Sequence, residues 1–260
     1  MLRDVVPYGT DYWAGQAGDS PFAPGERLIP GTRLARPTLA WFYPEVPPEQ
    51  PIPFEYTVLY EDSELIVVDK PHFLPTTSNG RIVRETLQTR LRVDYGEEGI
   101  VPLHRLDRLT AGVVVCSRNP ATRGKYQRLF QDRGLRKHYR ARVAEPFFFE
   151  GTVELAMYKP RGSRQVLVCE KGTPTQATST ETYVCAHGRE VELQPRTGHT
   201  HQLRVVLNHL GHPILGDDTY PADRGLDLYD FSRPLQLVHE RIEFTDPLSG
   251  EPRAFSLAWP

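Results

Sequence analysis

Residues 104–116 read HRLDRLTAGVVVC and decide the fold around them. The final four, Val113–Cys116, form an apolar run of the length expected for a buried strand. The nine residues before them hold one carboxylate, Asp107, between Arg105 and Arg108. Neighbouring cations keep an aspartate ionised, so it can act as a nucleophile or a base. The same spacing also fits an aspartate that only pairs with an arginine in a turn.

Short apolar or alternating runs on both sides of this stretch predict further strands. A hairpin turn is expected at residues 186–189, where Gly188 follows the polar His187. Strands outnumber helices and do not alternate regularly with them. This predicts an α+β domain, with a mixed, largely antiparallel central sheet and flanking helices. The predicted strands span residues 65–68, 113–116, 137–143, 178–185, 190–194, 235–239 and 242–244.

Three helices are predicted between these strands. The first covers residues 84–91. Asn119 is expected to cap the second, with Pro120 at its first position. Thr200 is expected to cap the third, which covers residues 201–210 and places apolar residues along one buried face.

The two parts of the chain differ in composition. Residues 1–55 are rich in proline and aromatic residues and are expected to form an irregular arm, whereas residues 56–260 form the main domain. No run of about 18 apolar residues occurs and the N-terminus does not resemble a signal peptide, which predicts a cytoplasmic protein without a membrane partner. Three scattered cysteines do not indicate a disulfide framework.

Charge is distributed unevenly along the chain. The whole chain has a net charge of -2, but residues 104–143 contain eleven basic and two acidic residues, a net charge of +9. Such a concentration of arginine and lysine favours a site for a polyanion such as RNA. A solvated basic surface without a partner would show the same pattern.

A second polar stretch, residues 196–204, reads RTGHTHQLR. It is predicted to be a glycine-containing loop that leads into a helix N-terminus, an arrangement suited to anions. Arg204 lies one turn into that helix, where it can reach a partner carboxylate. The histidines from His199 to His212 also raise the possibility of a metal site, although no HExxH pattern is present.

These segments together resemble a known family. HRLDRLTAG at residues 104–112 resembles the HRLDxxTSG signature of RluA-type pseudouridine synthases. RTGHTHQLRVVLNHLGHPILGDDTY at residues 196–220 resembles a later motif of that family. YEDSELIVVDKP, RKHYRARV and LQLVHERIEFTDPLSGE match three further family segments in the same order. The chain departs from the family at Ala111, where serine is usual, and at His199, where arginine is usual.

The resemblance implies an enzyme that isomerises uridine to pseudouridine in structured ribosomal or transfer RNA, without a metal or another cofactor. It implies that Asp107 attacks a flipped-out uridine, that Arg204 pairs with Asp107, and that Tyr139 stacks on the uracil and assists proton removal. The residues expected to contact the substrate are Arg105, Leu203, Lys70, Arg108 and His199. Of these, Lys70 is expected at the pocket edge, touching the RNA backbone.

Two other functions stay open on the sequence, and a monomer is expected in each case. One is a non-catalytic RNA-binding module on the same fold. The other is a metal-dependent phosphoesterase that uses the histidines together with Asp107.

Overall fold

The computed structural model describes residues 11–15, 22–23, 25–29, 31, 39–42, 48–78, 81–132, 134–170 and 176–257. The chain divides into two compact units, Met1–Pro48 and Glu49–Pro260. Three short strands of the first unit form an antiparallel sheet in the order β2-β1-β3: β1 Tyr12–Ala14, β2 Arg27–Leu28 and β3 Ala40–Phe42. Most of the predicted arm lies outside the described residues, and its irregular structure stays a prediction.

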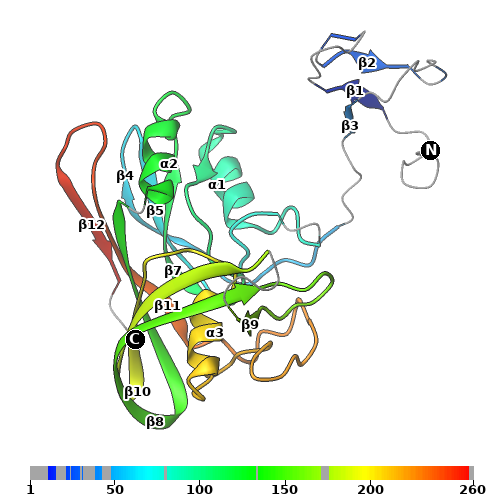
Figure 1. Ribbon diagram of the computed structural model, residues 1–260. Helices are drawn as coiled ribbons and strands as arrows, with labels where there is room; N and C mark the ends of the chain where they lie inside the picture. The colour runs from blue at the N-terminus through cyan, green and yellow to red at the C-terminus, as the bar shows by residue number, and fades with distance from the viewer. Residues whose placement is uncertain are drawn as a thin grey trace. The chain divides into compact units, whose positions relative to one another are not determined.

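Nine strands form a single sheet within the described residues of the second unit (Figure 1). They are β4 Thr57–Glu61, β5 Leu65–Lys70, β6 Val101–Pro102, β7 Ala111–Ser117, β8 Leu135–Tyr158, β9 Leu167–Cys169, β10 Thr178–Pro195, β11 Leu237–Thr245 and β12 Pro252–Ser256. The main path runs β10-β8-β11-β7-β5-β4. Among the strand pairs in the described part of this sheet, only β7 with β11 is parallel, so the predicted mixed, largely antiparallel α+β fold is confirmed.

β10 is one continuous strand, so the predicted hairpin turn at residues 186–189 is wrong. Gly188 has a φ of 72°, and the register with β8 shifts between Gly188 and Glu190. Because β8 pairs with β10 on both sides of this point, the irregularity is a bulge. β11 likewise joins the two strands predicted at residues 235–239 and 242–244 across a register shift. Polar residues or a glycine within a strand pattern are compatible with a bulge as well as with a turn. The two are distinguished only by whether the neighbouring strand pairs with the chain on both sides of the interruption.

The three predicted helices are present: α1 Leu87–Tyr95, α2 Arg123–Gln131 and α3 Gln202–His209. α1 begins later than predicted, because the Thr86 side chain accepts the N–H of Thr89. α2 begins at Arg123 and is not capped by Asn119, whose side-chain oxygen instead accepts the N–H of Ala121 in the preceding turn. None of the helices in the described residues has the length and apolar character needed to cross a membrane.

β7 is buried along its whole length and anchors the centre of the sheet. Val114 and Cys116 belong to a core that includes residues of α1, whereas Val113 and Val115 belong to a core that includes Tyr126 of α2. Burying a valine side chain contributes about 1.5–3 kcal/mol, so both faces of β7 hold it strongly in place. The polar loop that enters β7, which carries the predicted nucleophile, is therefore fixed at its C-terminal end.

Candidate active site

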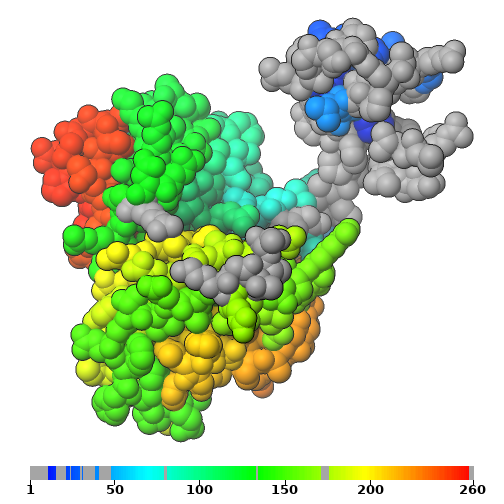
Figure 2. Space-filling view, in the orientation of Figure 1, coloured from blue at the N-terminus to red at the C-terminus, as the bar shows by residue number. Residues whose placement is uncertain are grey.

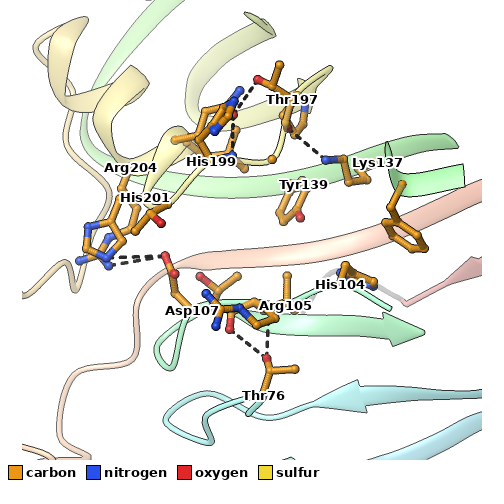
Figure 3. A pocket seen from close by; sticks show the side chains of 18 of the residues that line it. Thr76, His104, Arg105, Asp107, Lys137, Tyr139, Thr197, His199, His201 and Arg204 are labelled. Atoms are coloured by element: carbon orange, nitrogen blue, oxygen red, sulfur yellow. Dashed lines mark hydrogen bonds and ion pairs between the residues drawn. The ribbon is translucent and has the colours of Figure 1, made fainter. Parts of the chain in front are cut away.

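A cavity of about 570 Å³ lies between the loop that enters β7, the start of β8 and the N-terminal end of α3 (Figure 3). Segments far apart in the sequence meet here because β7 and β8 are both neighbours of β11. The predicted site residues that line the cavity are Arg105, Asp107, Arg108, Tyr139, His199, Leu203 and Arg204. The structure thus brings seven of the eight predicted residues together.

Asp107 is held in the cavity by its backbone. Its carbonyl oxygen accepts the N–H of Thr110 at 3.0 Å. The preceding residue, Leu106, exchanges two hydrogen bonds with the Thr76 hydroxyl, at 2.9 and 3.1 Å. The Asp107 side chain is 35% exposed, so it is open to a substrate. Its carboxylate faces Arg204 and His201 across the cavity (Figure 3).

Arg204 and Asp107 form the ion pair that the family resemblance implies, but they are not the closest partners. The Nη1 atom of Arg204 is 3.8 Å from Asp107 Oδ2, a distance for an ion pair without a hydrogen bond. The close partner is Asp217, which accepts from Nε at 2.8 Å and from Nη2 at 2.5 Å. Asp218 also accepts from Nη2, at 2.9 Å. Burial opposes the charge of Arg204, but these carboxylates raise its pKa, so the guanidinium is positively charged.

His201 was not predicted as a site residue, yet its Nε2 lies 3.9 Å from Asp107 Oδ2. It precedes α3 in the left-handed conformation, with φ 57°, and takes the N-cap position predicted for Thr200. Its Nδ1 is 3.2 Å from the Tyr220 hydroxyl. Burial lowers the pKa of His201 to about 4 although Asp107 opposes this, so the ring is neutral at physiological pH. An uncommon backbone conformation in a non-glycine residue is often found at a functional site.

Tyr139 lines the cavity from β8 and stacks on His239, with ring centroids 4.4 Å apart and planes at 20°. His239 is fully buried, and its Nδ1 lies 2.6 Å from the carbonyl oxygen of Val113. Burial and then the charge of Asp107 raise the pKa of Tyr139, so its phenol stays protonated. A neutral ring with a fixed orientation suits stacking on a base.

The prediction that Lys70 touches the RNA backbone is wrong. Lys70 is completely buried and does not line the cavity. Its ammonium group donates to the carbonyl oxygens of Pro71 and Leu74, both at 2.8 Å. Burial lowers the pKa of Lys70 to about 7. This lysine therefore fixes the turn that follows β5 and is out of reach of a phosphate.

The remaining predicted residues occupy different depths of the cavity. Arg105 and His199 are exposed, whereas Leu203 is 7% exposed. Arg108 donates to the carbonyl oxygens of Asp227 and Leu228, both at 3.2 Å, and burial lowers its pKa. Arg108 therefore already donates hydrogen bonds within the protein, whereas Arg105 is exposed to solvent.

The basic window of residues 104–143 is partly neutralised by acidic neighbours. Arg118 pairs with Glu97, and Arg142 pairs with Glu190. Arg140 lies near two glutamates. The positive charge that faces the cavity comes from Arg105, Arg108 and Lys137, together with Arg196 and Arg204 from the second motif.

The histidines considered as metal ligands do not converge. His201 faces Asp107, His199 is exposed, and His212 stacks on Phe147 with centroids 3.9 Å apart. No group of three potential metal-ligating side chains is found in the part of the chain that the structure describes.

Comparison with known proteins defines the class. Residues 64–209 match the family model described as RNA pseudouridylate synthase. The chain is 35% identical over 217 residues to the dual-specificity RNA pseudouridine synthase RluA of Salmonella typhi, covering 81% of this chain and 95% of the relative. The identity to RluA of Escherichia coli (strain K12) is 34%, covering 80% and 94%. A solved structure of human RNA pseudouridylate synthase domain containing 1 has the same fold, with a TM-score of 0.64, 24% identity, and coverage of 79% and 84%.

The fold and these matches define an RNA-modifying isomerase, a pseudouridine synthase that converts uridine in RNA to pseudouridine. The chain belongs to the RNA pseudouridylate synthase family, and its identity to RluA over most of both chains makes it an RluA-type member.

The sequence reasoning missed three site residues, His201, Asp217 and Asp218. Their signals were present in the motifs THQLR and GDDTY, where polar residues interrupt apolar segments.

Proposed function

We propose that this cavity isomerises a uridine that has flipped out of structured RNA, ribosomal or transfer, and that Asp107 is the nucleophile. One observation carries the proposal: Asp107 is the only acidic side chain among the described residues that line the cavity. Every other charged lining residue is cationic or a histidine. A carboxylate oxygen that is open to the cavity can act as a nucleophile toward a bound nucleoside.

The chemistry needs no change in oxidation state. Asp107 attacks the nucleoside, and the bond between uracil N1 and ribose C1′ breaks. The uracil then turns within the cavity and its C5 bonds to C1′, while the bond that Asp107 formed to the nucleoside breaks and frees the carboxylate. The proton leaves C5, and N1 gains a proton. Atoms and electrons balance within the substrate, so the proposed reaction uses no cofactor. The neutral phenol of Tyr139 provides a surface on which the detached uracil can stack while it turns.

Binding requires that the base leave its stack, which costs a few kcal/mol. Arg105, exposed at the mouth, is placed to occupy the vacated position or to hold a phosphate. His199 is also exposed at the mouth. A cavity of about 570 Å³ is of the size that binds small ligands and can hold one nucleoside. Leu203 provides an apolar wall.

The wider organisation is also a proposal. We infer a cytoplasmic monomer whose catalytic domain spans residues 56–260 and whose arm spans residues 1–55. The compact unit that contains this domain begins at Glu49, whose carboxylate accepts the N–H groups of Val83, Arg84 and Glu85.

The test is pseudouridine mapping of total RNA after incubation with the wild type or with Asp107→Asn, in the presence and in the absence of a chelator. Asparagine is nearly isosteric with aspartate and lacks only the charge, so isomerisation is expected to fall below detection while folding and RNA binding persist. Asp132→Asn is the matched control, because Asp132 is exposed and outside the cavity.

The outcomes separate the alternatives. Sites made by the wild type and by Asp132→Asn but not by Asp107→Asn would support the proposal. Binding without any modified site would favour a non-catalytic RNA-binding module. Activity that disappears only in the chelator would favour metal-dependent chemistry. Turnover retained by Asp107→Asn would exclude Asp107 as the nucleophile.

A further inference from the structure

Arg204 is shared among three carboxylates. Asp217 occupies Nε and Nη2, and Asp218 takes a second hydrogen bond from Nη2. Nη1 is the nitrogen nearest to Asp107, at 3.8 Å. The direction in which Nη1 points therefore depends on how Asp217 and Asp218 hold the rest of the guanidinium.

One guanidinium cannot balance three carboxylates. Arg204 is 3% exposed, Asp217 is 1% exposed and Asp218 is 25% exposed, so water screens the excess negative charge only in part. Uncompensated charge in such a place is strongly unfavourable. Arg108 lies near Asp218, but its guanidinium donates to the carbonyl oxygens of Asp227 and Leu228. A further cation that binds Asp218 directly would offset part of this excess.

Arg164 provides that cation from the segment between β8 and β9. Its Nη2 donates to Asp218 Oδ2 at 2.5 Å, and its Nη1 donates to Asp223. Asp218 is thus divided between two arginines, with Oδ1 on Arg204 and Oδ2 on Arg164. Burial raises the pKa of Asp218, but a hydrogen bond from Thr219 and the two arginines outweigh it and lower that pKa.

The residues beside Arg164 hold the same loop. The Gln165 amide donates to the carbonyl oxygen of Thr219 at 2.8 Å, and the N–H of Val166 donates to the Tyr220 hydroxyl at 2.8 Å. The loop that follows α3, orange in Figures 1 and 2, is thereby tied both to α3 and to the segment that carries Arg164.

We propose that Arg164 is a positioning residue for the reaction. Arg164 binds one oxygen of Asp218, so Asp218 has only its other oxygen available for Arg204. Without Arg164, both oxygens of Asp218 could bind Arg204, and the guanidinium would rotate so that Nη1 no longer points to Asp107. Arg164 acts through Asp218 and Arg204 and does not touch the reacting atoms. The inference rests on the proposed role of Asp107.

The test compares kcat and KM of the full chain on one RNA transcript that it modifies. Arg164→Gln is expected to lower kcat about tenfold and to change KM less than about twofold, since the loss concerns geometry in the transition state. Arg164→Lys keeps a positive charge near Asp218, so its kcat is expected to fall only about threefold. The double variant Arg164→Gln with Asp218→Asn removes the competing charge and is expected to recover kcat to within about threefold of the wild type.

Arg118→Gln is the matched control. Arg118 also binds a carboxylate, Glu97, through two of its nitrogens, and its side chain is 27% exposed against 25% for Arg164. It does not line the cavity, so kcat is expected to stay unchanged. Should Arg164→Gln fail to fold, the double variant still carries the test, because it removes the Asp218 charge, and the other partner of Arg164, Asp223, is 36% exposed and can be solvated.

Three results would overturn the inference. Unchanged kcat in Arg164→Gln would show that Arg204 needs no such support. A rise in KM alone would make Arg164 a direct RNA contact. A double variant whose kcat is no higher than that of Arg164→Gln would show that Arg164 only stabilises the loop after α3. Asp107→Asn is assayed in parallel. Activity in Asp107→Asn would refute the proposed function. If Asp107→Asn is inactive, the three results above concern the role of Arg164 alone.

Discussion

Replacement of Asp217 by alanine tests how the buried arginine is held. The Asp217 side chain is 1% exposed and accepts from two nitrogens of Arg204 and from the backbone N–H groups of Thr219 and Tyr220. Asp217→Ala removes all four hydrogen bonds at once. It leaves an arginine that is 3% exposed with Asp218 as its remaining close partner.

The expected magnitude follows from that burial. Breaking a buried ion pair by removing one partner costs about 3–5 kcal/mol. In a domain of this size each kcal/mol lowers Tm by about 2–4 °C, so Tm is expected to fall by about 6–20 °C. If the freed guanidinium shifts by about 1 Å, kcat per folded molecule falls by about a hundredfold. Thermal unfolding and turnover of the folded fraction below its transition measure the two effects separately.

Asp246→Ala is the matched control. Asp246 is equally buried, at 1%, and lies 3.1 Å from Arg253, but that arginine is 26% exposed and lies away from the cavity. Water can solvate Arg253 once its partner is removed, so a smaller loss of about 1–3 kcal/mol is expected, with unchanged kcat. The reasoning would be refuted if Asp217→Ala unfolded within about 1 kcal/mol of the wild type, or if the two variants lost kcat equally.

Two further predictions concern the frame of the site. Gly112 has a φ of 117°, and an added Cβ would lie 2.4 Å from the His239 carbonyl oxygen, so Gly112→Ala is expected to lose more than about 3 kcal/mol in chemical denaturation. In contrast, a Cβ added at Gly124 in α2 meets nothing within 4 Å, so Gly124→Ala is expected to raise the free energy of unfolding by about 0.5–1 kcal/mol. Equal changes in stability for the two variants would contradict the predicted clash at Gly112. Burial lowers the pKa of His239 to about 3, below its value of about 6.5 when unfolded, so the unfolded chain binds the extra proton. The contribution of neutral His239 to the free energy of unfolding is therefore fully present above pH 6.5 and is lost as the pH drops toward 3. At pH 5 this residue alone lowers the free energy of unfolding by about 2 kcal/mol. Tm of His239→Phe should fall less steeply than that of the wild type between pH 7 and 5, and parallel curves would show that His239 contributes nothing.

The sequence by itself determined the fold class and the chemistry of the site. The apolar run after Asp107, the alternation around Tyr139 and the stripe that contains Leu203 are local patterns, because the period of a strand or helix is set by residues a few positions apart. The order of the motifs then indicated the family. These features need no knowledge of which segments meet in space.

Tertiary structure alone decided the partners and the depth of the side chains. The sequence paired Arg204 with Asp107, but the loop after α3 brings Asp217 closer and takes the stronger hydrogen bonds. The family resemblance placed Lys70 at the pocket edge, but the turn after β5 closes over the ammonium group. Burial and charge pairing depend on which distant segments lie against each other, and that is fixed by packing of the whole sheet. The place of Asp107 in the cavity could therefore be predicted from sequence, whereas the network of carboxylates that holds Arg204 could not.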